Sequence, residues 1–263
     1  MRVTKKSDNW SLYLSWQRSG SHLVFTLTET GESLTVNSYF SADYYKIESV
    51  ELFDGTALDL AQIELDVRTL TGSEAADTLT GGETDDTLLG NGGNDRLRGA
   101  AGSDGLFGGA GNDNLYGGDG NDELIGGAGN DYLSGDAGND IYIFGSGFGS
   151  DTLYNYDTQV GRVDVAQFEG AAVEELWFSR DGNNLRINVV GTEDQVLVSN
   201  WFSGDSYQLD SIEVANSILL NSDVEQLVEA MSPYSVPIGE GSVIPEDVMD
   251  ELQPVLADTW LIL

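Results

Sequence analysis

The sequence lacks cysteine and is poor in histidine, proline and positive charge. Of its 263 residues none is cysteine, one is histidine (His22) and four are proline, while 11 lysines and arginines stand against 45 aspartates and glutamates. Without cysteine no disulfide can stabilise the fold. A single histidine argues against Ser-His-Asp and Cys-His catalytic arrangements, and no zinc-binding motif is present. The net charge of −34 argues against nucleic acid as a partner, because phosphate binding needs a basic surface.

Long apolar runs are also missing. No stretch approaches the roughly 20 residues that span a bilayer, so we expect no stable membrane insertion. The opening MRVTKKSDNWSLYLSW has no apolar core of the kind that a cleaved secretory signal needs. Among the 45 acidic residues no carboxylate pair stands out as a glycosidase pair. We therefore expect no enzyme activity in this chain and place any catalysis upstream of it.

What the sequence has in abundance is a nine-residue repeat. Eight rows run from GSEAADTLT, beginning at Gly72, to GDAGNDIYI, ending at Ile143. The first place is Gly in every row, and the eighth is Leu in every row but the last, where it is Tyr142. A ninth row, GSGFGSDTL, restores the pattern two residues late with Asp151. The sixth place is Asp throughout, at Asp77, Asp86, Asp95, Asp104, Asp113, Asp122, Asp131 and Asp140.

The unit is too short for a helical repeat. Six residues rich in Gly, Asn and Asp predict a turn, and the next three, such as 114–116, predict a very short strand with one side chain inward. Two units of nine would then make one turn of a flattened coil of about 18 residues, and four such turns would stack about 4.8 Å apart. The eighth-place leucines would form the core between two sheets.

Stacking would place the aspartates in two columns, with Asp77, Asp95, Asp113 and Asp131 on one edge and Asp86, Asp104, Asp122 and Asp140 on the other. Carboxylates about 5 Å apart repel by about 3 kcal/mol per pair at an effective dielectric of 20. The alternative, turn-forming aspartates that face water, does not require Asp at one place in every row. We therefore predict divalent cations between stacked loops, held by two carboxylates and several carbonyls. All-oxygen, flexible sites suit calcium better than magnesium.

The rows resemble the RTX, or haemolysin-type, calcium-binding nonapeptide GGxGxDxUx, in which U is a large apolar residue. The resemblance covers about 72–153 and implies an all-β fold, a parallel β-roll that is a right-handed β-solenoid with about 18 residues per turn. It also implies that each calcium takes the carbonyls of places two and four and the Asp of one loop. The loop 18 residues later would add the carbonyls of places one and three and its own Asp.

The carried-over carbonyl ligands are Gly90, Asn91, Gly92, Gly93, Gly99, Ala101, Gly102, Gly108, Gly109, Ala110, Gly111, Gly117, Gly118, Asp119, Gly120, Gly126, Gly127, Ala128, Gly129, Gly135 and Ala137. The first two rows depart from the pattern, because Ser73, Ala75 and Thr84 replace glycine. Glycine visits positive φ freely, so we expect these first sites to be weak or empty. Eight loops give about six ions, and the late loop at Asp151 together with extra edge contacts would raise the number to about eight.

The segments that flank the repeat match each other. Residues 20–52 and 182–214 align without a gap, and both alternate apolar and polar residues, which predicts strand pairs. The second copy resembles the domain commonly found just after RTX arrays, and we expect it to cap the roll. The first copy then implies another array upstream. We therefore expect Met1 to start the C-terminal piece of a larger protein, with a short native protein as the alternative.

Two further groups of residues have two interpretations each. Arg180 and Asp181 with Trp177 and Trp201 are predicted to form cap core and a hairpin turn, with a sugar site as the alternative. After residue 214, a capping-box pattern at 222–225 predicts a short helix to about Met231.

The remaining tail holds all four prolines and is predicted to be linker-like. Its ending, DTWLIL, resembles the uncleaved C-terminal signals of type I secretion substrates. The alternative is a tail that packs Trp260 and Leu261 onto the caps.

Four segments are therefore predicted: a β-rich N-terminal flank at 1–70, a calcium-binding β-roll at 71–153, a β-rich cap with a short helix at 154–230, and a tail with a secretion signal at 231–263. The predicted function is that of a calcium-binding module in a secreted bacterial protein. It would fold on calcium outside the cell and support secretion and stability of a larger protein, with calcium and a type I exporter as partners. The alternatives are an adhesin that binds carbohydrate or protein, and the C-terminal part of a secreted protease, lipase or toxin.

Overall fold

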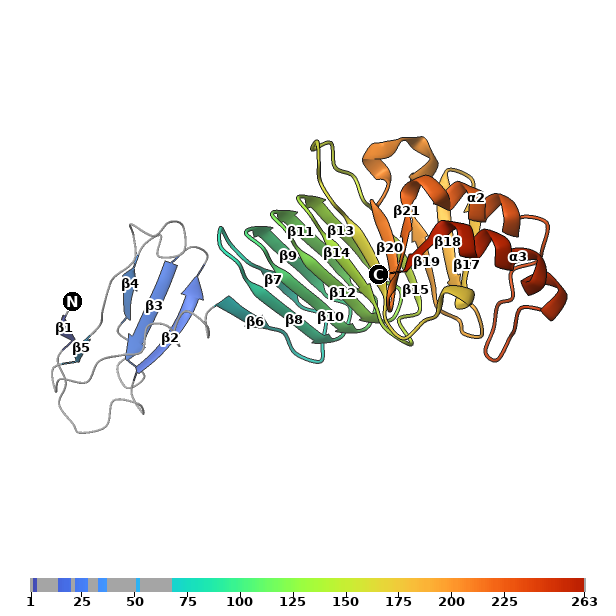
Figure 1. Cartoon of the computed structure of the whole chain (residues 1–263). Coiled ribbons are helices and arrows are strands. Elements are labelled where there is room, and N and C mark those ends of the chain that lie inside the picture. Colours follow the sequence, from blue (N-terminus) through green and yellow to red (C-terminus); the bar gives the residue numbers. More distant parts are fainter. Residues whose placement is uncertain are drawn as a thin grey trace.

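The structure, a computed structural model, describes residues 68–262 together with the backbone of five short strands before them. Those five are β1 (Arg2–Val3), β2 (Leu14–Ser19), β3 (His22–Leu27), β4 (Ser33–Val36) and β5 (Glu51–Leu52). From residue 68 onward the chain forms a stack of parallel strands and then a strand-rich segment with two helices (Figure 1).

The stack is the predicted parallel β-solenoid, with about 5 turns of ~18 residues. Successive rows alternate between two sheets, and each strand pairs in parallel with the strand two rows away, so that Leu106 lies between Leu88 and Leu124. One sheet contains β6 (Thr69–Thr71), β8 (Thr87–Gly92), β10 (Gly105–Ala110), β12 (Glu123–Ala128) and β14 (Ile141–Phe144). The other contains β7 (Thr78–Thr80), β9 (Arg96–Ala101), β11 (Asn114–Asp119), β13 (Tyr132–Ala137) and β15 (Ser150–Leu153).

The strands in the middle of the roll are longer than the three residues that the sequence predicts. β11 has six, because the first three places of the next row also join the ladder: Gly118 pairs with Ala100 and with Asp136. Between β10 and β11 only residues 111–113 lie outside a strand. The glycines of places one and two are thus strand residues, although their composition is typical of a turn.

The core of the roll is the predicted row of eighth-place side chains. Six leucines have no exposed surface, at Leu88, Leu97, Leu106, Leu115, Leu124 and Leu133. Tyr142 continues the row and is equally buried. Its hydroxyl donates to Oδ1 of Asn155 at 2.9 Å and accepts from the N–H of Gly135, so the one polar group in this row is satisfied.

The cap continues both sheets of the roll without a break. β16 (Val165–Phe168) and β20 (Ser211–Val214) extend the first sheet in parallel, and β19 (Gln195–Val198) pairs in parallel with β15. The sheets then end in antiparallel strands, β17 (Leu176–Asp181) with β18 (Asn184–Val189), and β21 (Ser217–Leu220) with β22 (Trp260–Ile262). Three 3-10 turns lie between strands, at Val173–Glu175, Trp201–Ser203 and Asp205–Tyr207.

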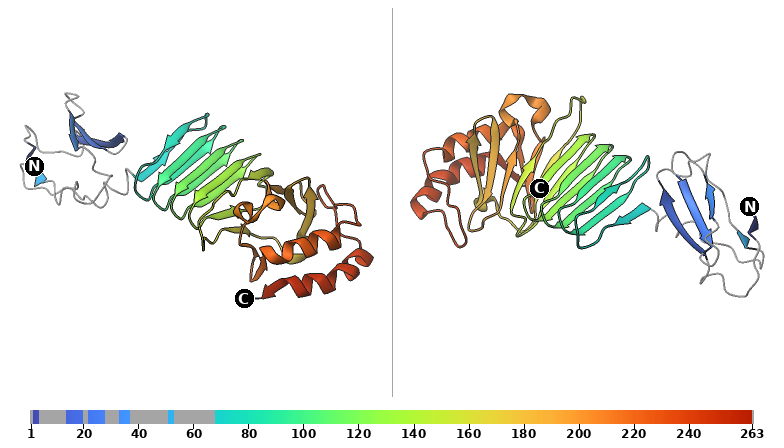
Figure 2. Two further views of the ribbon diagram at one scale, coloured as in Figure 1. Left: turned by 90° about the horizontal axis from the view of Figure 1, so that it is seen from above. Right: turned by 180° about the vertical axis from the view of Figure 1, so that it is seen from behind.

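Two helices lie at this end of the molecule (Figure 2). The predicted short helix is confirmed as α2 (Asn221–Met231), but its N-cap is Leu220, two residues before the predicted Ser222, and makes no side-chain cap bond. The predicted linker-like tail is wrong. It forms α3 (Glu246–Thr259) and then β22, with Pro254 inside the helix. Among the described residues no helix is long and apolar enough to cross a membrane.

The tail packs as the alternative interpretation proposes, at least at Trp260. Its side chain is buried and lies against Phe178 with ring centroids 6.5 Å apart. Leu261, in contrast, is 51% exposed. The secretion signal that the ending resembles stays a prediction.

The two flanks share one topology. β2, β3 and β4 form an antiparallel sheet in which Leu14 pairs with Leu27, and Leu23 with Val36. The cap repeats both pairings at a distance of 162 residues, as Leu176 with Val189 and Leu185 with Val198. The internal match seen in the sequence is therefore also a match of strand order and register.

We predict that Leu115→Ala destabilises the calcium-loaded roll by about 2 to 5 kcal/mol, because it removes a side chain without exposed surface from a closed core. Chemical denaturation in excess calcium measures this change. Asn114→Ala, at the exposed neighbouring position, is the control and should change stability by less than about 0.5 kcal/mol. Equal losses in the two variants would contradict this account of the core.

Candidate calcium sites

The sixth-place aspartates form two ladders of hydrogen bonds. The backbone N–H of Asp95 donates to Oδ1 of Asp113 at 2.7 Å, and that of Asp113 donates to Oδ1 of Asp131 at 2.8 Å. The other edge repeats the bond from Asp104 to Asp122 at 2.8 Å. Each carboxylate is thus held in register over its neighbour, in the two columns that the sequence predicts, and from Asp86 onward each is almost fully buried.

The second oxygen of most of these carboxylates has no such donor in the described part of the chain. Within residues 68–262, seven Oδ2 atoms are buried and have no hydrogen-bond partner, those of Asp95, Asp104, Asp113, Asp122, Asp131, Asp140 and Asp151. A buried charge without a partner costs several kcal/mol, so native proteins pair such groups or bind metal ions to them. The observation fits a cation beside each Oδ2.

First-place glycines leave room for these carboxylate oxygens. A Cβ on Gly108 would lie 2.4 Å from Oδ2 of Asp113 and 2.4 Å from the carbonyl oxygen of Gly126. At Gly117 the corresponding distances, to Asp122 and Gly135, are 2.2 and 2.8 Å. A carboxylate oxygen and the first-place carbonyl of the loop above therefore converge on one point. This is one of the ligand pairs that the RTX resemblance implies.

Glycine is favoured at the second and fourth places of the row for a different reason, the backbone conformation. Positive φ occurs at places two and four, as at Gly109 (104°) and Gly111 (136°), and not at the first place. A non-glycine residue can adopt it, since Asn91 has φ 73°. Among residues 68–262 positive φ begins at Asn91. Ser73, Ala75 and Thr84 of the first two rows therefore do not share the loop conformation of the later rows.

The first aspartate also differs in its partners. Oδ2 of Asp77 accepts hydrogen bonds from the N–H of Ser73 at 2.6 Å and from its hydroxyl at 2.8 Å, and these bonds lower the pKa of Asp77. The protein itself thus supplies donors here, whereas from Asp95 to Asp151 the corresponding oxygens have none among residues 68–262. The expectation that the first site is weak stays a prediction, now with a physical reason.

The late row stacks in register despite its two extra residues. The N–H of Asp131 donates to Oδ1 of Asp151 at 2.8 Å, and Leu133 pairs with Leu153. The carboxylate of Asp194 accepts the N–H groups of Gly147 and Gly149 at 2.8 and 2.9 Å and so holds the longer loop.

A second ladder, which sequence reasoning missed, runs outside the first. The fifth-place Asn112 N–H donates to Oδ1 of Asn94 at 2.9 Å, and Asn130 repeats the bond to Asn112 at 2.8 Å. These bonds run in the opposite direction along the stack. The Asn that precedes the Asp in five of the eight rows was the available signal for it, because its side-chain oxygen can accept the backbone N–H of the loop 18 residues later.

Burial dominates the electrostatics of the columns. It raises the pKa of Asp104 and Asp140 to about 7 and that of Asp151 to about 8, while the N–H bond from the neighbouring Asp lowers each pKa by a smaller amount. The pKa values of Asp122 and Asp131 rise to about 6 for the same reason. Without a metal ion, these carboxyl groups keep their protons in the folded roll at a pH between 3.8 and about 6, where the same groups in an unfolded chain would be ionised.

The set of donors has the composition that calcium prefers. Within residues 68–262 no three His, Cys, Asp or Glu side chains converge, and the predicted sites use only two stacked carboxylates each, with backbone carbonyls. All of the predicted carbonyl ligands from Gly90 to Ala137 lie in the strand ends and loops of β8 to β13. Their roles as ligands, and the number of ions, stay predictions.

The residues that suggested a sugar site are structural instead. Trp177 and Trp201 are buried in the cap core, and the guanidinium of Arg180 lies 4.2 Å from the ring centroid of Phe202. Asp181 ends β17 at the hairpin and pairs with Arg186 at 2.5 Å. The prediction of cap core and a hairpin turn is confirmed.

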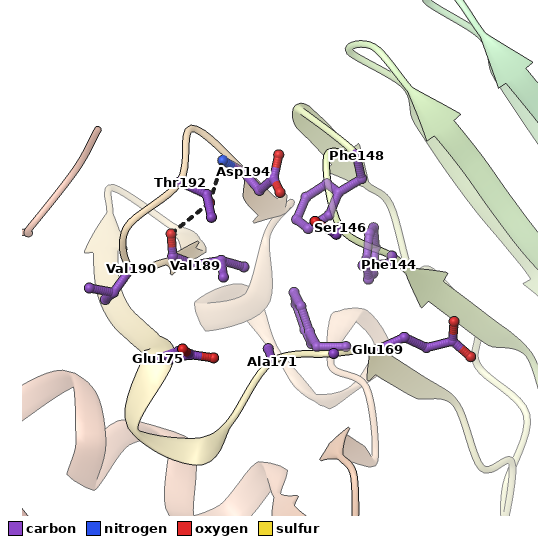
Figure 3. A pocket seen from close by; sticks show the side chains of 13 residues that line it. Phe144, Ser146, Phe148, Glu169, Ala171, Glu175, Val189, Val190, Thr192 and Asp194 are labelled. Atoms are coloured by element: carbon purple, nitrogen blue, oxygen red, sulfur yellow. Dashed lines mark hydrogen bonds between the residues drawn. The ribbon is translucent and has the colours of Figure 1, made fainter. Parts of the chain in front are cut away.

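One cavity lies where the roll meets the cap. It measures about 180 Å³ and is lined by Phe144, Phe148 and Phe168 with the acidic side chains of Glu169, Glu175 and Asp194 (Figure 3). Ligand pockets usually measure about 300 to 1,000 Å³. This cavity is therefore small for an organic ligand, and Asp194 is already engaged with the loop.

Comparison with known families identifies the chain. Residues 71–106, 107–142 and 116–153 match the RTX calcium-binding nonapeptide repeat, and residues 22–62 and 184–223 match the haemolysin-type calcium binding protein related domain. The chain belongs to the RTX calcium-binding repeat family and carries the related domain on both sides of its repeats. It is a calcium-binding β-roll module.

Individual relatives cover parts of the chain or are distant. The iron-regulated protein FrpA of Neisseria meningitidis serogroup C is 40% identical over 93 residues, which are 34% of this chain and 8% of FrpA. The chain thus spans less than a tenth of that relative.

Two solved structures are similar only at a distance. The extracellular lipase LipA of Serratia marcescens is 16% identical, with 81% of this chain and 32% of LipA covered and a TM-score of 0.35. The AlgE6R3 subunit of the Azotobacter vinelandii mannuronan C5-epimerase is 23% identical, with 66% and 88% covered and a TM-score of 0.29.

We predict that Gly108→Ala weakens calcium binding, because the new methyl group would lie 2.4 Å from two oxygens at the point where they converge. Calcium titration followed by circular dichroism should show a higher midpoint and a less cooperative transition. Gly145→Ala is the matched control, since its Cβ meets no atom within 4 Å. The site geometry would be wrong if both variants titrated like the unsubstituted protein.

We also predict that acid partly replaces calcium. The carboxyls with pKa values of about 6 to 8 bind protons more tightly in the folded roll than at their ordinary value of 3.8 in the unfolded chain. Without calcium, the roll should therefore gain stability as the pH falls from above about 8 through about 6. Circular dichroism of resin-treated, calcium-free protein at pH 8.5 and 5.5 tests this. A β-signal that stays constant or falls on acidification would contradict it.

Proposed function

We propose that this chain is a calcium-driven folding module of a secreted bacterial protein. The observation that carries the proposal is the pair of buried carboxylate columns whose second oxygens, from Asp95 to Asp151, have no donor within residues 68–262. Neighbouring carboxylates within a column repel each other in the absence of metal, so the closed roll is disfavoured where calcium is scarce. Calcium binds to the stacked loops of the folded state and stabilises that state by mass action.

The coupling suits export of an unfolded chain. In the cytosol, where calcium is low, the acidic repeat would remain open and could pass through a type I exporter. Outside the cell, calcium modules typically bind at about 10⁻⁴ to 10⁻³ M, and folding would then stabilise the protein to which the module is joined. The match to 8% of a longer relative supports a module within a larger protein. An extracellular location and the exporter as partner belong to this proposal.

We propose further that the module itself is not an enzyme, so that any catalysis is carried by another part of the protein. The sequence holds a single histidine, and the two tryptophans that suggested sugar binding are buried. The burial of Trp177 and Trp201 also removes the observation that favoured the adhesin alternative. A glycan array with this chain would detect carbohydrate binding, and the adjoining sequence would identify an attached protease, lipase or toxin.

We predict that the calcium-free chain at pH 8 lacks the β-signal of the roll and gains it on addition of millimolar calcium. Magnesium should not substitute, because it requires a nearly octahedral shell and retains its water. Circular dichroism with either ion, and isothermal titration for the number bound, measure both effects. A roll that is fully formed in chelator at pH 8 would refute calcium-driven folding.

A further inference from the structure

The second carboxylate column does not stop at Asp140 but continues into the cap. The N–H of Asp140 donates to Oδ1 of Asp164 at 3.1 Å, and the N–H of Asp164 donates to Oδ2 of Asp210 at 2.9 Å. The strands that follow these aspartates, β14, β16 and β20, pair in parallel in the same register. Residues 159–164 and 205–210 are therefore two further loops of this edge, although neither has the glycine-rich sequence of the repeat.

Counting back from each aspartate gives the equivalent places in these two loops. Asp164 and Asp210 are sixth-place residues, so that Asp205 holds the first place of its loop. Arg162 and Gln208 hold the fourth places. A basic side chain at the fourth place is without parallel in the rows from Gly72 to Ile143, where that place holds Ala, Thr or Gly.

The guanidinium of Arg162 contacts the atoms that would bind an ion at this rung. Its Nε lies 2.9 Å from Oδ2 of Asp164, and its Nη2 donates to the carbonyl oxygen of Asp205 at 3.0 Å. In the repeat, the equivalent pair consists of a sixth-place Oδ2 and the first-place carbonyl of the loop above. That pair converges at Gly108, from Asp113 and Gly126.

Further oxygen atoms lie close to this cation. Nη2 of Arg162 also donates to the carbonyl oxygen of Gln208 at 2.8 Å, and Oδ2 of Asp157 lies 4.0 Å from Nε. The side chain of Arg162 is 10% exposed and that of Asp164 is 1% exposed. The Asn155 amide donates to the same Oδ2 of Asp164 at 2.9 Å. Two carboxylates and two carbonyls are the kind of shell that calcium takes in a protein.

Asp164 consequently differs from the rungs below it. Oδ2 of Asp140 is buried and has no hydrogen-bond partner in the described part of the chain, whereas Oδ2 of Asp164 has a cation and an amide donor. The chain itself therefore neutralises this rung. A guanidinium with a fixed charge suits the task, because it cannot lose its proton in a protein.

We propose that Arg162 is a built-in cation that takes the place of calcium at this rung, so that the cap closes on Asp164 without calcium. The cap then offers a preformed end on which the calcium-dependent turns of the roll can stack. The inference rests on the calcium-driven folding proposed above and adds a residue that sets where the calcium requirement begins.

The test compares Arg162→Gln with Arg186→Gln in the full chain. The control removes the same charge from β18, where Arg186 pairs with Asp181 at the surface. Hydrogen exchange by mass spectrometry is measured in chelator and in excess calcium. In chelator, the unsubstituted protein and R186Q should protect β16 and β20 while β8 to β13 exchange freely. R162Q should lose protection of β16 and β20 in chelator and regain it in calcium.

A second variant tests the site directly. Arg162→Ala vacates the oxygen shell, so native mass spectrometry in calcium should count one more ion than in the unsubstituted protein or in R186Q. The inference is overturned if R162Q stays protected in chelator, if its loss of protection is not reversed by calcium, or if R162A binds no extra ion. If any of these three results is found while the unsubstituted roll still folds on calcium, only the role of Arg162 is overturned and calcium-driven folding stands. A roll that ignores calcium overturns both proposals.

Discussion

The structure depends on one constraint, the stacking of like charges in a buried column. The backbone N–H of each sixth-place Asp satisfies one oxygen of the Asp above it, which brings the carboxylates into register. This bond fixes the spacing of the column at the distance between paired strands, about 4.8 Å. The second oxygen then faces a buried space in which the repeat supplies no donor. The same geometry that aligns the rungs therefore creates the need for a cation between them.

The repeat sequence follows from this need place by place. The first place is Gly because a Cβ would occupy the point where a carboxylate and a carbonyl converge, as at Gly117. The second and fourth places favour Gly because the chain there takes positive φ, as at Gly118 (120°) and Gly120 (135°). The eighth place is Leu because it alone points into the core. Glycine thus recurs within a single row for two different physical reasons, the lack of room for a Cβ and the positive φ.

The sequence was sufficient to predict the roll because each row has the same environment as the next. Period, columns and core follow from the spacing of Asp and Leu alone. Strand length was underestimated, since Gly118 and Asp119 look like turn residues but pair with the strand below. Asp164 and Asp210 were missed because excursions of 24 and 46 residues separate them from the rungs below, and their loops lack glycine at the first, second and fourth places.

The tail was missed for another reason. Its prolines suggested a linker, yet Pro245 immediately precedes α3 and Pro254 is tolerated within it. A proline before the first turn costs little, because the first N–H groups of a helix have no partner inside the helix. Leu252 and Leu256, four residues apart and both buried, were the signal for this helix.

The ends of the columns show how the repeat can be limited to part of the chain. At the beginning of one column Ser73 donates two hydrogen bonds to Oδ2 of Asp77, and near the end of the other Arg162 and Asn155 reach Oδ2 of Asp164. Between these ends, from Asp95 to Asp151, the second oxygens have no donor within residues 68–262. Side chains and backbone of the protein thus donate to Oδ2 at two column ends but not, within the described residues, between Asp95 and Asp151. If the ladder alone stabilised the fold, donors would be equally useful at every rung, and a single serine or asparagine per row would supply them. Their absence where the repeat is most regular argues that those positions are reserved for an ion from outside the chain.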